Sequence, residues 1–336
     1  MQYVIGVDGG GTKTVCALAN ENGDIVNILR SGCTNHQICG LATAVDRISR
    51  LIDDILSSAE LCYEDVKYVY LGLSGADFPS DVTTLRQAMQ HRFPSLRLEV
   101  VNDIWLVFAS ENYEGWGAVS ICGTGHNAAV MQPDGETYGI WALKDTLGNY
   151  GGGRQITDSA LHYAFRSFQQ TGPHTRLEDL LPQLCGVLDM NQLAFAVYNS
   201  NYEYQHQFAI PSLVFQLAEE GDEVCRRLVR ESGAVMGEIL GGLIRKSKLE
   251  AHVLPVALGG ALYTSKNNRL LLQSFREGLG NAAPAYDFRL AKSPPVAGAL
   301  ITALKNIGVN VDAAFSAELA ANIRNFLSVN KGVELI

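Results

Sequence analysis

The chain has 336 residues, of which 47% are hydrophobic and 18% are charged, a composition typical of globular proteins. At roughly 100–200 residues per domain, this length predicts two domains, each large enough to bury its own core. The formal net charge of −9 argues against non-specific binding to nucleic acid or to an anionic membrane. It does not argue against a nucleotide ligand, because backbone amides and Mg²⁺ can hold phosphates on an acidic protein.

Seven cysteines occur and none forms a C-x-x-C pair, so the spacing of zinc ribbons and of dithiol redox motifs is not found. An odd number of cysteines in apolar surroundings predicts reduced, mostly buried thiols and a cytoplasmic protein. The first residues have neither the basic region nor the long apolar region of a signal peptide. No apolar run reaches the roughly 18 residues of a membrane-spanning helix, so we expect neither a membrane nor a nucleic-acid partner.

The N-terminal part of the chain predicts an α/β domain with a mixed sheet. Residues 3–7 are expected to form a buried strand, and residues 14–19 its antiparallel partner across a tight glycine turn. Apolar side chains recur at helical spacing over residues 41–61. The other elements expected here are strands at 24–29, 67–73 and 96–101, a helix at 81–91 and a short helix that ends near residue 110.

The order of strand, glycine turn, strand, turn and strand begins again near residue 117, which predicts a second domain of related topology whose glycine hairpin faces the first. After residue 148 the chain is mostly helical. The amphipathic tail at 313–327 is interpreted as a docked helix, with a contact in a homodimer as the alternative. The elements expected are strands at 117–122, 127–131, 138–141, 253–258 and 285–289, and helices at 155–169, 177–184, 208–219, 222–247, 268–277 and 294–305.

The turn between the first two strands has the composition of an anion-binding loop. Consecutive glycines let backbone N–H groups approach an anion, and such turns form anion-binding nests. The turn also supplies hydroxyl groups, a lysine and a carboxylate, Asp8, that can hold Mg²⁺ through water. A plain glycine turn is the alternative, since the spacing matches neither the common phosphate loop nor the dinucleotide fingerprint. The residues of this first hairpin are Asp8, Gly9, Gly10, Gly11, Thr12, Lys13 and Thr14.

Three other positions could carry chemistry. Gly123-Thr124-Gly125 repeats the glycine turn in the second domain, with a plain hairpin turn as the alternative. Asp103 follows a predicted strand and opens a helix, where it could act as a helix N-cap, as a general base, or as both. Gly259-Gly260 follows an apolar strand and suits either a tight turn or close passage of the backbone past an adenine ring.

Taken in chain order, seven motifs resemble the N-acetylglucosamine kinase branch of the actin, hexokinase and sugar-kinase ATPase superfamily. That branch also contains the ATPase activators of benzoyl-CoA reductase and of 2-hydroxyacyl-CoA dehydratase. The resemblance covers nearly the whole chain. The matching segments are 6–14 (first phosphate motif), Thr34-Asn35-His36 with Gly40 and 72–77 (sugar loops), Asn102-Asp103 (catalytic base), 123–127 (second phosphate motif), 258–261 (adenosine motif) and 294–300 (late connecting helix).

The resemblance implies a kinase that uses ATP and Mg²⁺ to phosphorylate a hydroxyl group of an amino sugar such as N-acetylglucosamine, expected to be the 6-hydroxyl. It implies an α/β fold of two ribonuclease H-like (actin-like ATPase) domains with a central cleft. The expected parts are residues 1–112 on the sugar side, residues 113–308 on the nucleotide side with a helical insertion, and a C-terminal helix within residues 309–336 that docks on the first domain.

The resemblance also assigns roles to individual residues. Asp103 would be the catalytic base, and Asp8 would hold Mg²⁺ through water. The nucleotide would be bound by the first hairpin together with Gly123, Thr124, Gly259 and Gly260. The sugar would be bound by Asn35, His36, Ser74, Gly125, Asn127 and Asn149.

One segment departs from the family. Where the family has G-D-E-G-S, with an aspartate that contacts the sugar, this chain has Gly148-Asn149-Tyr150-Gly151-Gly152. Asn149 can still hydrogen-bond to hydroxyl groups, but it carries no charge and donates as well as accepts. The preceding segment, 140–145, is two residues longer than in the family, and its Asp145 is a candidate for the replaced carboxylate.

Three alternatives to an N-acetylglucosamine kinase stay open. They are a kinase for glucosamine, N-acetylmannosamine or N-acetylmuramic acid, an iron–sulphur ATPase activator, and a catalytically weak sugar-binding module.

Overall fold

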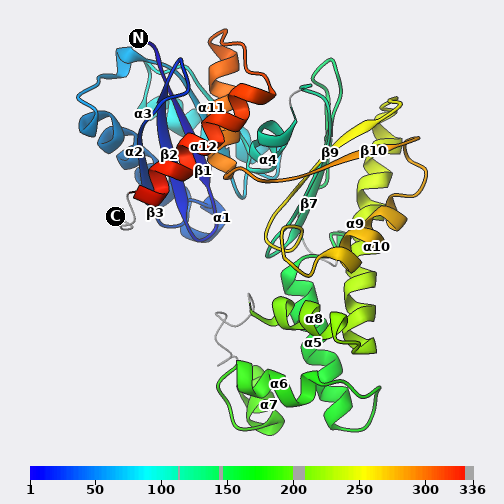
Figure 1. Ribbon diagram of the computed structural model, residues 1–336. Coiled ribbons are helices and arrows are strands. Elements are labelled where there is room, and N and C mark those ends of the chain that lie inside the picture. Colours follow the sequence, from blue (N-terminus) through cyan, green and yellow to red (C-terminus); the bar gives the residue numbers. More distant parts are fainter. Residues whose placement is uncertain (113, 144–146, 200–208, 330–336) are drawn as a thin grey trace. The chain divides into compact units, whose positions relative to one another are not determined.

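The computed structural model describes residues 1–112, 114–143, 147–199 and 209–329 (Figure 1). The chain divides into two compact units, and each has its own five-stranded sheet. Unit 1 comprises Met1–Trp116 together with Ala291–Ile336, and unit 2 comprises Gly117–Leu290. The predicted α/β fold class is confirmed.

The sheet of unit 1 is mixed and has the strand order β3-β2-β1-β4-β5. Its strands are β1 Tyr3–Gly9, β2 Thr14–Asn20, β3 Ile25–Ser31, β4 Val66–Leu73 and β5 Leu98–Asn102. Strands β1 and β2 form the predicted antiparallel hairpin, and β2 pairs antiparallel with β3. Strands β4 and β5 extend the sheet on the other side of β1 in parallel register, so their carboxyl ends lie at the same edge as that of β1.

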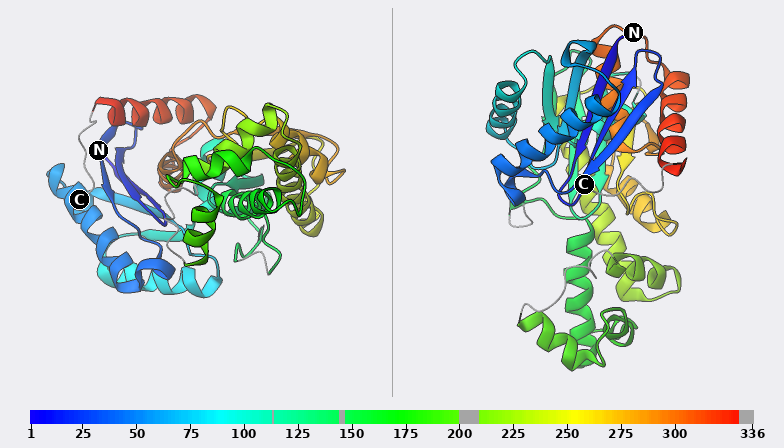
Figure 2. Two further views of the ribbon diagram at one scale, coloured as in Figure 1. Left: turned by 90° about the horizontal axis from the view of Figure 1, so that it is seen from below. Right: turned by 90° about the vertical axis from the view of Figure 1, so that its left-hand side faces the viewer.

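Helices cover both faces of this sheet. The helices of unit 1 are α1 His36–Cys39, α2 Leu41–Ser58, the 3-10 helix η1 Tyr63–Asp65, α3 Pro79–Arg92, α4 Ile104–Glu111, α11 Pro295–Asn306 and α12 Ala313–Val329. Successive side chains of a strand point to opposite faces, so Ile5 packs with Ile52 of α2 while Val4 packs with Leu300 of α11. Helices α2 and α3 therefore lie on one face, and α4, α11 and α12 on the other (Figure 2, left view).

Helix α11 belongs to unit 1, although it follows the last strand of unit 2 in the chain. A Cβ atom on Gly6 of β1 would lie 2.8 Å from the Cβ atom of Ala299. A Cβ atom on Gly298 would lie only 1.8 Å from the carbonyl oxygen of Leu106 in α4. Only glycine permits such close packing. The second compact unit therefore ends at residue 290 and not at the expected residue 308, because α11 is buried against β1 and α4.

The C-terminal helix α12 packs on β3 of unit 1. Its side chains Leu319 and Ile323 are buried in the same hydrophobic cluster as Ile28. The apolar face of this amphipathic segment is thus covered within the chain.

The sheet of unit 2 has the strand order β10-β9-β6-β7-β8. Its strands are β6 Gly117–Cys122, β7 His126–Met131, β8 Thr137–Gly139, β9 Leu254–Gly259 and β10 Tyr286–Leu290. In this sheet β6, β7, β8, β9 and β10 take the places that β1 to β5 take in unit 1, with the same parallel and antiparallel pairings. The predicted repetition of topology is confirmed.

A helical insertion between β8 and β9 makes up the rest of unit 2, together with one helix between β9 and β10. The helices are α5 Gly153–Phe168, α6 Leu177–Leu184, α7 Met190–Tyr198, α8 Ala209–Glu219, α9 Glu223–Ser247 and α10 Arg269–Leu279. Helices α5 to α8 gather at one end of the unit-2 sheet (Figures 1 and 2). The sequence did not predict α7, nor did it predict α1, which at four residues is too short for a helical period to stand out.

Candidate active site

The first hairpin is held in place by neighbouring loops. Pairing of β1 with β2 runs up to Gly9 and Thr14, and the amide of Gly10 donates to Lys13 O at 2.9 Å. The amide of Ser74 donates to Gly9 O at 2.7 Å, and the amide of Thr34 donates to Gly10 O at 3.1 Å. The predicted phosphate hairpin and the two predicted sugar loops are therefore brought together at one edge of the unit-1 sheet.

The residues of this hairpin differ in exposure. Thr12 and Lys13 are exposed, whereas Thr14 is fully buried. The hydroxyl group of Thr14 donates to Gly32 O at 2.8 Å and lies 2.8 Å from Thr34 Oγ1. This side chain supports the hairpin from inside, while Thr12 and Lys13 at the turn are exposed to solvent.

Two carboxylates beside the hairpin have raised pKa values. Burial raises the pKa of Asp8 from 3.8 to about 6, and the charge of Lys13 opposes this rise. Burial is also the main reason why the pKa of Asp103 rises to about 7, and the charges of Asp8 and then Asp77 add to it. Asp8, Asp77 and Asp103 thus interact as one acidic cluster. A base with a pKa near 7 suits proton transfer at neutral pH.

Asp103 lies at the start of α4, but its side chain makes no capping hydrogen bond to the helix. The preceding side chain does this instead, because Asn102 Oδ1 accepts from the amide of Ile104 at 3.0 Å. Of the two roles that the sequence left open for Asp103, the side-chain cap is therefore not formed, and the role of base stays a prediction.

The predicted sugar residues Asn35 and Ser74 are in contact. Asn35 is buried and caps α1, since its Oδ1 atom accepts from the amide of Gln37 at 2.9 Å. Its Nδ2 atom donates to Ser74 Oγ at 3.2 Å. The loop before α1 and the loop after β4 are therefore joined directly.

His36 lies in the same loop and is partly buried. Its Nε2 atom lies 3.5 Å from Asp81 Oδ1, and Asp81 in turn accepts from the amide of Phe78 through Oδ2 at 2.9 Å. His36 thus links the sugar loop to the first turn of α3.

The second hairpin, in unit 2, has an open turn. The amide of Gly123 donates to Gly125 O at 3.0 Å, and a Cβ atom on either glycine would meet no atom within 4 Å. The first amides of α5 hold the turn, because Gly153 N donates to Gly123 O at 2.8 Å and Arg154 N donates to Thr124 O at 2.9 Å. The carbonyl groups of the turn are thereby directed toward α5.

Asn149, the residue that departs from the family, lies on the second hairpin. Its Nδ2 atom donates to the carbonyl oxygen of His126 at 3.0 Å. An ionised aspartate could not donate this bond, because a carboxylate only accepts. Asn127 follows His126 and is partly buried, with its Oδ1 atom 2.9 Å from the amide of Ala128. Asp145, the candidate for the replaced carboxylate, lies outside the described residues.

Gly259-Gly260 ends strand β9 in a conformation that requires glycine. Gly260 has a φ of +94°, and a Cβ atom there would lie 2.3 Å from the carbonyl oxygen of Cys122. The turn therefore lies directly on the strand that leads into the second hairpin, so that two of the predicted nucleotide motifs are neighbours in unit 2.

Comparison with known proteins assigns the chain to a family. The profile of the BadF/BadG/BcrA/BcrD ATPase family matches residues 5–303. The chain belongs to this family. The expected relationship to this group of ATPases is confirmed.

Relatives of the chain include proteins that are named as sugar kinases. The chain is 26% identical to the N-acetyl-D-glucosamine kinase of Dictyostelium discoideum over 260 residues, which cover 74% of this chain and 81% of that protein. It is 22% identical to the N-acetylmuramic acid/N-acetylglucosamine kinase of Clostridium acetobutylicum over 303 residues, or 90% of this chain and 98% of that protein.

Solved structures support the fold. A ROK family glucokinase from Streptomyces griseus, solved with glucose and AMPPNP, matches with a TM-score of 0.57 at 17% identity and covers 90% of this chain and 98% of its own. The ROK hexokinase of Thermus thermophilus matches with a TM-score of 0.58 at 16% identity and covers 90% and 97%. This member of the BadF/BadG/BcrA/BcrD ATPase family therefore shares its fold with these two proteins.

Two residues near the site were not selected from the sequence. Asp77 and Gln37 both hydrogen-bond within the acidic edge of unit 1, but neither was chosen as a site residue. Asp77 could have been selected from its position in the loop directly after β4, because side chains that follow parallel strands meet at one edge of a sheet.

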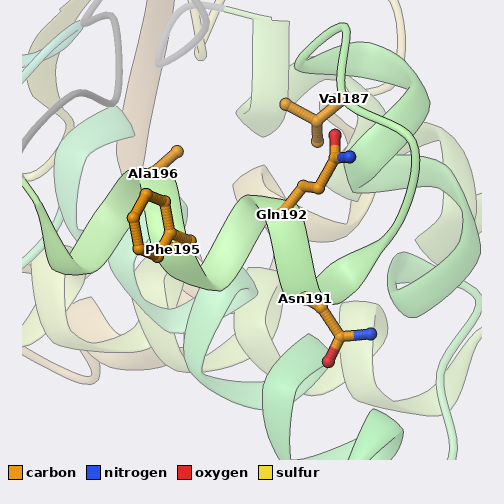
Figure 3. A pocket seen from close by; sticks show the side chains of 5 residues that line it. All are labelled: Val187, Asn191, Gln192, Phe195 and Ala196. Atoms are coloured by element: carbon orange, nitrogen blue, oxygen red, sulfur yellow. The ribbon is translucent and has the colours of Figure 1, made fainter.

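A shallow pocket of unit 2 lies elsewhere. It is formed by α7 and the turn before it, and none of the predicted site residues lines it (Figure 3). Its lining residues are Val187, Asn191, Gln192, Phe195 and Ala196. In the part of the chain that the structure describes, no helix is long and apolar enough to cross a membrane, and no group of three or more His, Cys, Asp and Glu side chains could hold a metal ion.

Proposed function

We propose that this chain is an ATP-dependent kinase that transfers a phosphoryl group to a hydroxyl group of an amino sugar. The observation that carries the proposal is the Asp103 carboxylate. It stands at the carboxyl end of β5 without a capping bond to α4, and its pKa is raised to about 7. A phosphoryl acceptor needs such a base next to its hydroxyl group.

The nucleotide would be held by backbone groups of both units. Unit 1 offers the first hairpin, from Gly9 to Thr14, and unit 2 offers Gly123 and Thr124 with the turn at Gly259-Gly260 for the adenosine. Mg²⁺ enters as part of the nucleotide substrate, and Asp8 would hold it through water. The metal and the backbone amides would offset the negative charge of the phosphoryl group in transfer.

The sugar would be bound next to Asp103. Asn35, Ser74 and His36 offer donors and acceptors in unit 1, and Gly125, Asn127 and Asn149 offer them in unit 2. Asp103 would accept the proton of the attacking hydroxyl group, which in the favoured assignment is the 6-hydroxyl. The site side chains are mainly neutral hydrogen-bonding groups, which suits a sugar better than a charged acceptor.

N-acetylglucosamine is the substrate we favour. Both relatives described above are named as kinases of N-acetylglucosamine, and the second is also named for N-acetylmuramic acid. A glucosamine kinase of Vibrio cholerae is 23% identical over 181 residues, or 54% of this chain and 60% of that protein. The Asn149 amide in place of the family's carboxylate keeps the choice among these amino sugars open to experiment.

An ADP-release assay tests the proposal. Purified protein with ATP and Mg²⁺ is screened against N-acetylglucosamine, glucosamine, N-acetylmannosamine, N-acetylmuramic acid and glucose, and ³¹P NMR identifies the phosphorylated hydroxyl group. We expect one amino sugar to stimulate ADP release, and we expect Asp103→Asn to lower kcat by about 10²–10⁴-fold.

The control is Asp54→Asn, which replaces an exposed carboxylate of α2 by the same amide. It should retain wild-type turnover. Full activity in Asp103→Asn would remove this residue from the base role. No stimulation by any sugar, with iron bound after anaerobic purification, would instead support an iron–sulphur ATPase activator.

A further inference from the structure

The Asp77 carboxylate lies at the edge of the unit-1 sheet where three loops meet. Its Oδ1 atom accepts from Asn102 Nδ2 at 3.0 Å, and its Oδ2 atom accepts from Gln37 Nε2 at 3.4 Å. Asn102 directly precedes Asp103, and Gln37 lies in α1, two residues after Asn35. The two oxygens of one side chain therefore connect the loop of the base with the loop of the sugar residues.

Both partners of Asp77 are fixed on their other sides as well. Asn102 Oδ1 accepts from the amide of Ile104, which sets the first turn of α4. Gln37 Nε2 also donates to Gly75 O at 3.0 Å, and the Gln37 amide donates to Asn35 Oδ1 at 2.9 Å. Hydrogen bonds thus run without a gap from Asn35 to the start of α4, with Asp77 in the middle.

We propose that Asp77 is a positioning residue, which sets the orientation of Asp103 relative to the loop that carries Asn35 and Ser74. The proposal rests on the kinase function proposed above. Asp77 positions Asp103 through Asn102 and Gln37, besides the charge that it adds near the base, and does not itself accept the proton. A displacement of about 1 Å at reacting groups can cost about 100-fold in rate, so a bridge of this kind controls turnover.

The donors and acceptors of the bridge define a selective test. In Asp77→Asn, one of the two oxygens becomes an NH₂ group, which must face the NH₂ group of either Asn102 or Gln37. In Asn102→Asp, two carboxylates face each other across the same gap. In the double variant Asp77→Asn/Asn102→Asp, the new amide at position 77 donates to the new carboxylate at position 102. Its oxygen still accepts from Gln37, and the acceptor for the Ile104 amide is kept.

The swap at residue 102 also removes a longer bond, from Asn102 Nδ2 to Ala76 O at 3.3 Å. We therefore expect rescue to be incomplete. Each single variant should lose about 10–100-fold in kcat/KM for the sugar while KM for ATP stays within about twofold. The double variant should recover to within about fivefold of the wild type, which makes the two substitutions strongly non-additive.

The experiment measures sugar and ATP kinetics for the wild type, both single variants, the double variant and the control Asp54→Asn. Hydrogen exchange of segments 34–40, 74–78 and 102–106 is followed by mass spectrometry on the same samples. The single variants should exchange faster in these segments, and the double variant should return toward the wild type.

The two readouts separate failure of the bridge from failure of the proposed function. If no sugar is phosphorylated by the wild type, the kinase function is wrong, and the positioning role falls with it, whatever the exchange pattern. If the wild type is a sugar kinase and the double variant is no better than the worse single variant, the positioning role alone is overturned. Single variants that keep wild-type kcat/KM would overturn it as well. If the single variants do not fold, Gln37→Ala, which removes only the bond to Oδ2 and that to Gly75, must still lower kcat/KM for the sugar.

Discussion

Replacing the Asp103 carboxylate by an amide is predicted to stabilise unit 1 at high pH. The pKa of Asp103 rises from 3.8 to about 7, because of burial first and then the charges of Asp8 and Asp77. An acid whose pKa is raised by folding stays protonated in the native state while the unfolded chain has already ionised. The contribution of Asp103 to the free energy of unfolding is therefore fully present below pH 4 and is lost as the pH rises toward 7.

The magnitude follows from the pKa values. Between pH 5 and pH 7 the ionisation costs about 1.4 kcal/mol per pH unit, or nearly 3 kcal/mol in all. Burial of the carboxylate raises this pKa, but the residue as a whole keeps some exposure, and solvent screening reduces the cost to about 2 kcal/mol. When the pH is raised from 5 to 8, the free energy of unfolding of Asp103→Asn should thus rise by about 2 kcal/mol relative to that of the wild type.

Hydrogen exchange in increasing urea measures this gain in β5 and α4, so that unit 1 is read separately from unit 2. The samples contain neither nucleotide nor divalent cation, because both would bind the native state and shift its stability. Asp54→Asn, at an exposed position, is the control for the substitution itself. A stability difference between Asp103→Asn and the wild type that is the same at pH 5 and pH 8 would refute the reasoning.

Two further predictions concern packing and a buried histidine. Gly298→Ala should lower the free energy of unfolding by about 3 kcal/mol or more, because its Cβ atom would lie 1.8 Å from the carbonyl oxygen of Leu106. Gly242→Ala is the control: its Cβ atom would meet no atom within 4 Å, and it should raise the free energy of unfolding by about 0.5–1 kcal/mol. Thermal unfolding measures both. Equal tolerance of the two substitutions would contradict the close contact of α11 with α4. Burial lowers the pKa of His126 from 6.5 to about 3, so unit 2 should lose about 2 kcal/mol between pH 6.5 and pH 5 as the unfolded chain alone takes up the proton. The stability that hydrogen exchange reports in β7 should depend less on pH in His126→Gln than in the wild type. The same pH dependence in both proteins would disprove the role of His126.

Much of the fold could be predicted from the sequence because each unit is built on local patterns. Apolar runs that end at glycine turns indicated β1 and β2, and the same pattern indicated β6 and β7. The assignment of α11 to unit 1 could not be predicted in this way. Periodicity shows that one face of a helix is buried, but it does not show which sheet buries it, and that choice depends on the fit of Gly298 to α4.

The candidate site could be predicted only in part, for a related reason. Glycine turns and a carboxylate after a strand have local signatures, so both hairpins and Asp103 could be proposed from the sequence. The partners of polar side chains have no such signature. The buried hydroxyl group of Thr14 forms a hydrogen bond with Thr34, and Asp77 forms one with Gln37, in each case with a residue far away in the sequence.

Asn149 shows how one residue that departs from the family can be matched to the hairpin that it contacts. Its Nδ2 atom is used by the carbonyl oxygen of His126, so the amide is already part of the second hairpin before any ligand binds. Its Oδ1 atom is buried and has no hydrogen-bond partner among the described residues. Returning the family's aspartate at this position would replace the donor by a second acceptor facing a carbonyl oxygen, which is unfavourable in a buried place. The asparagine is therefore matched to this hairpin, because only an amide at this position can donate to the carbonyl oxygen of His126.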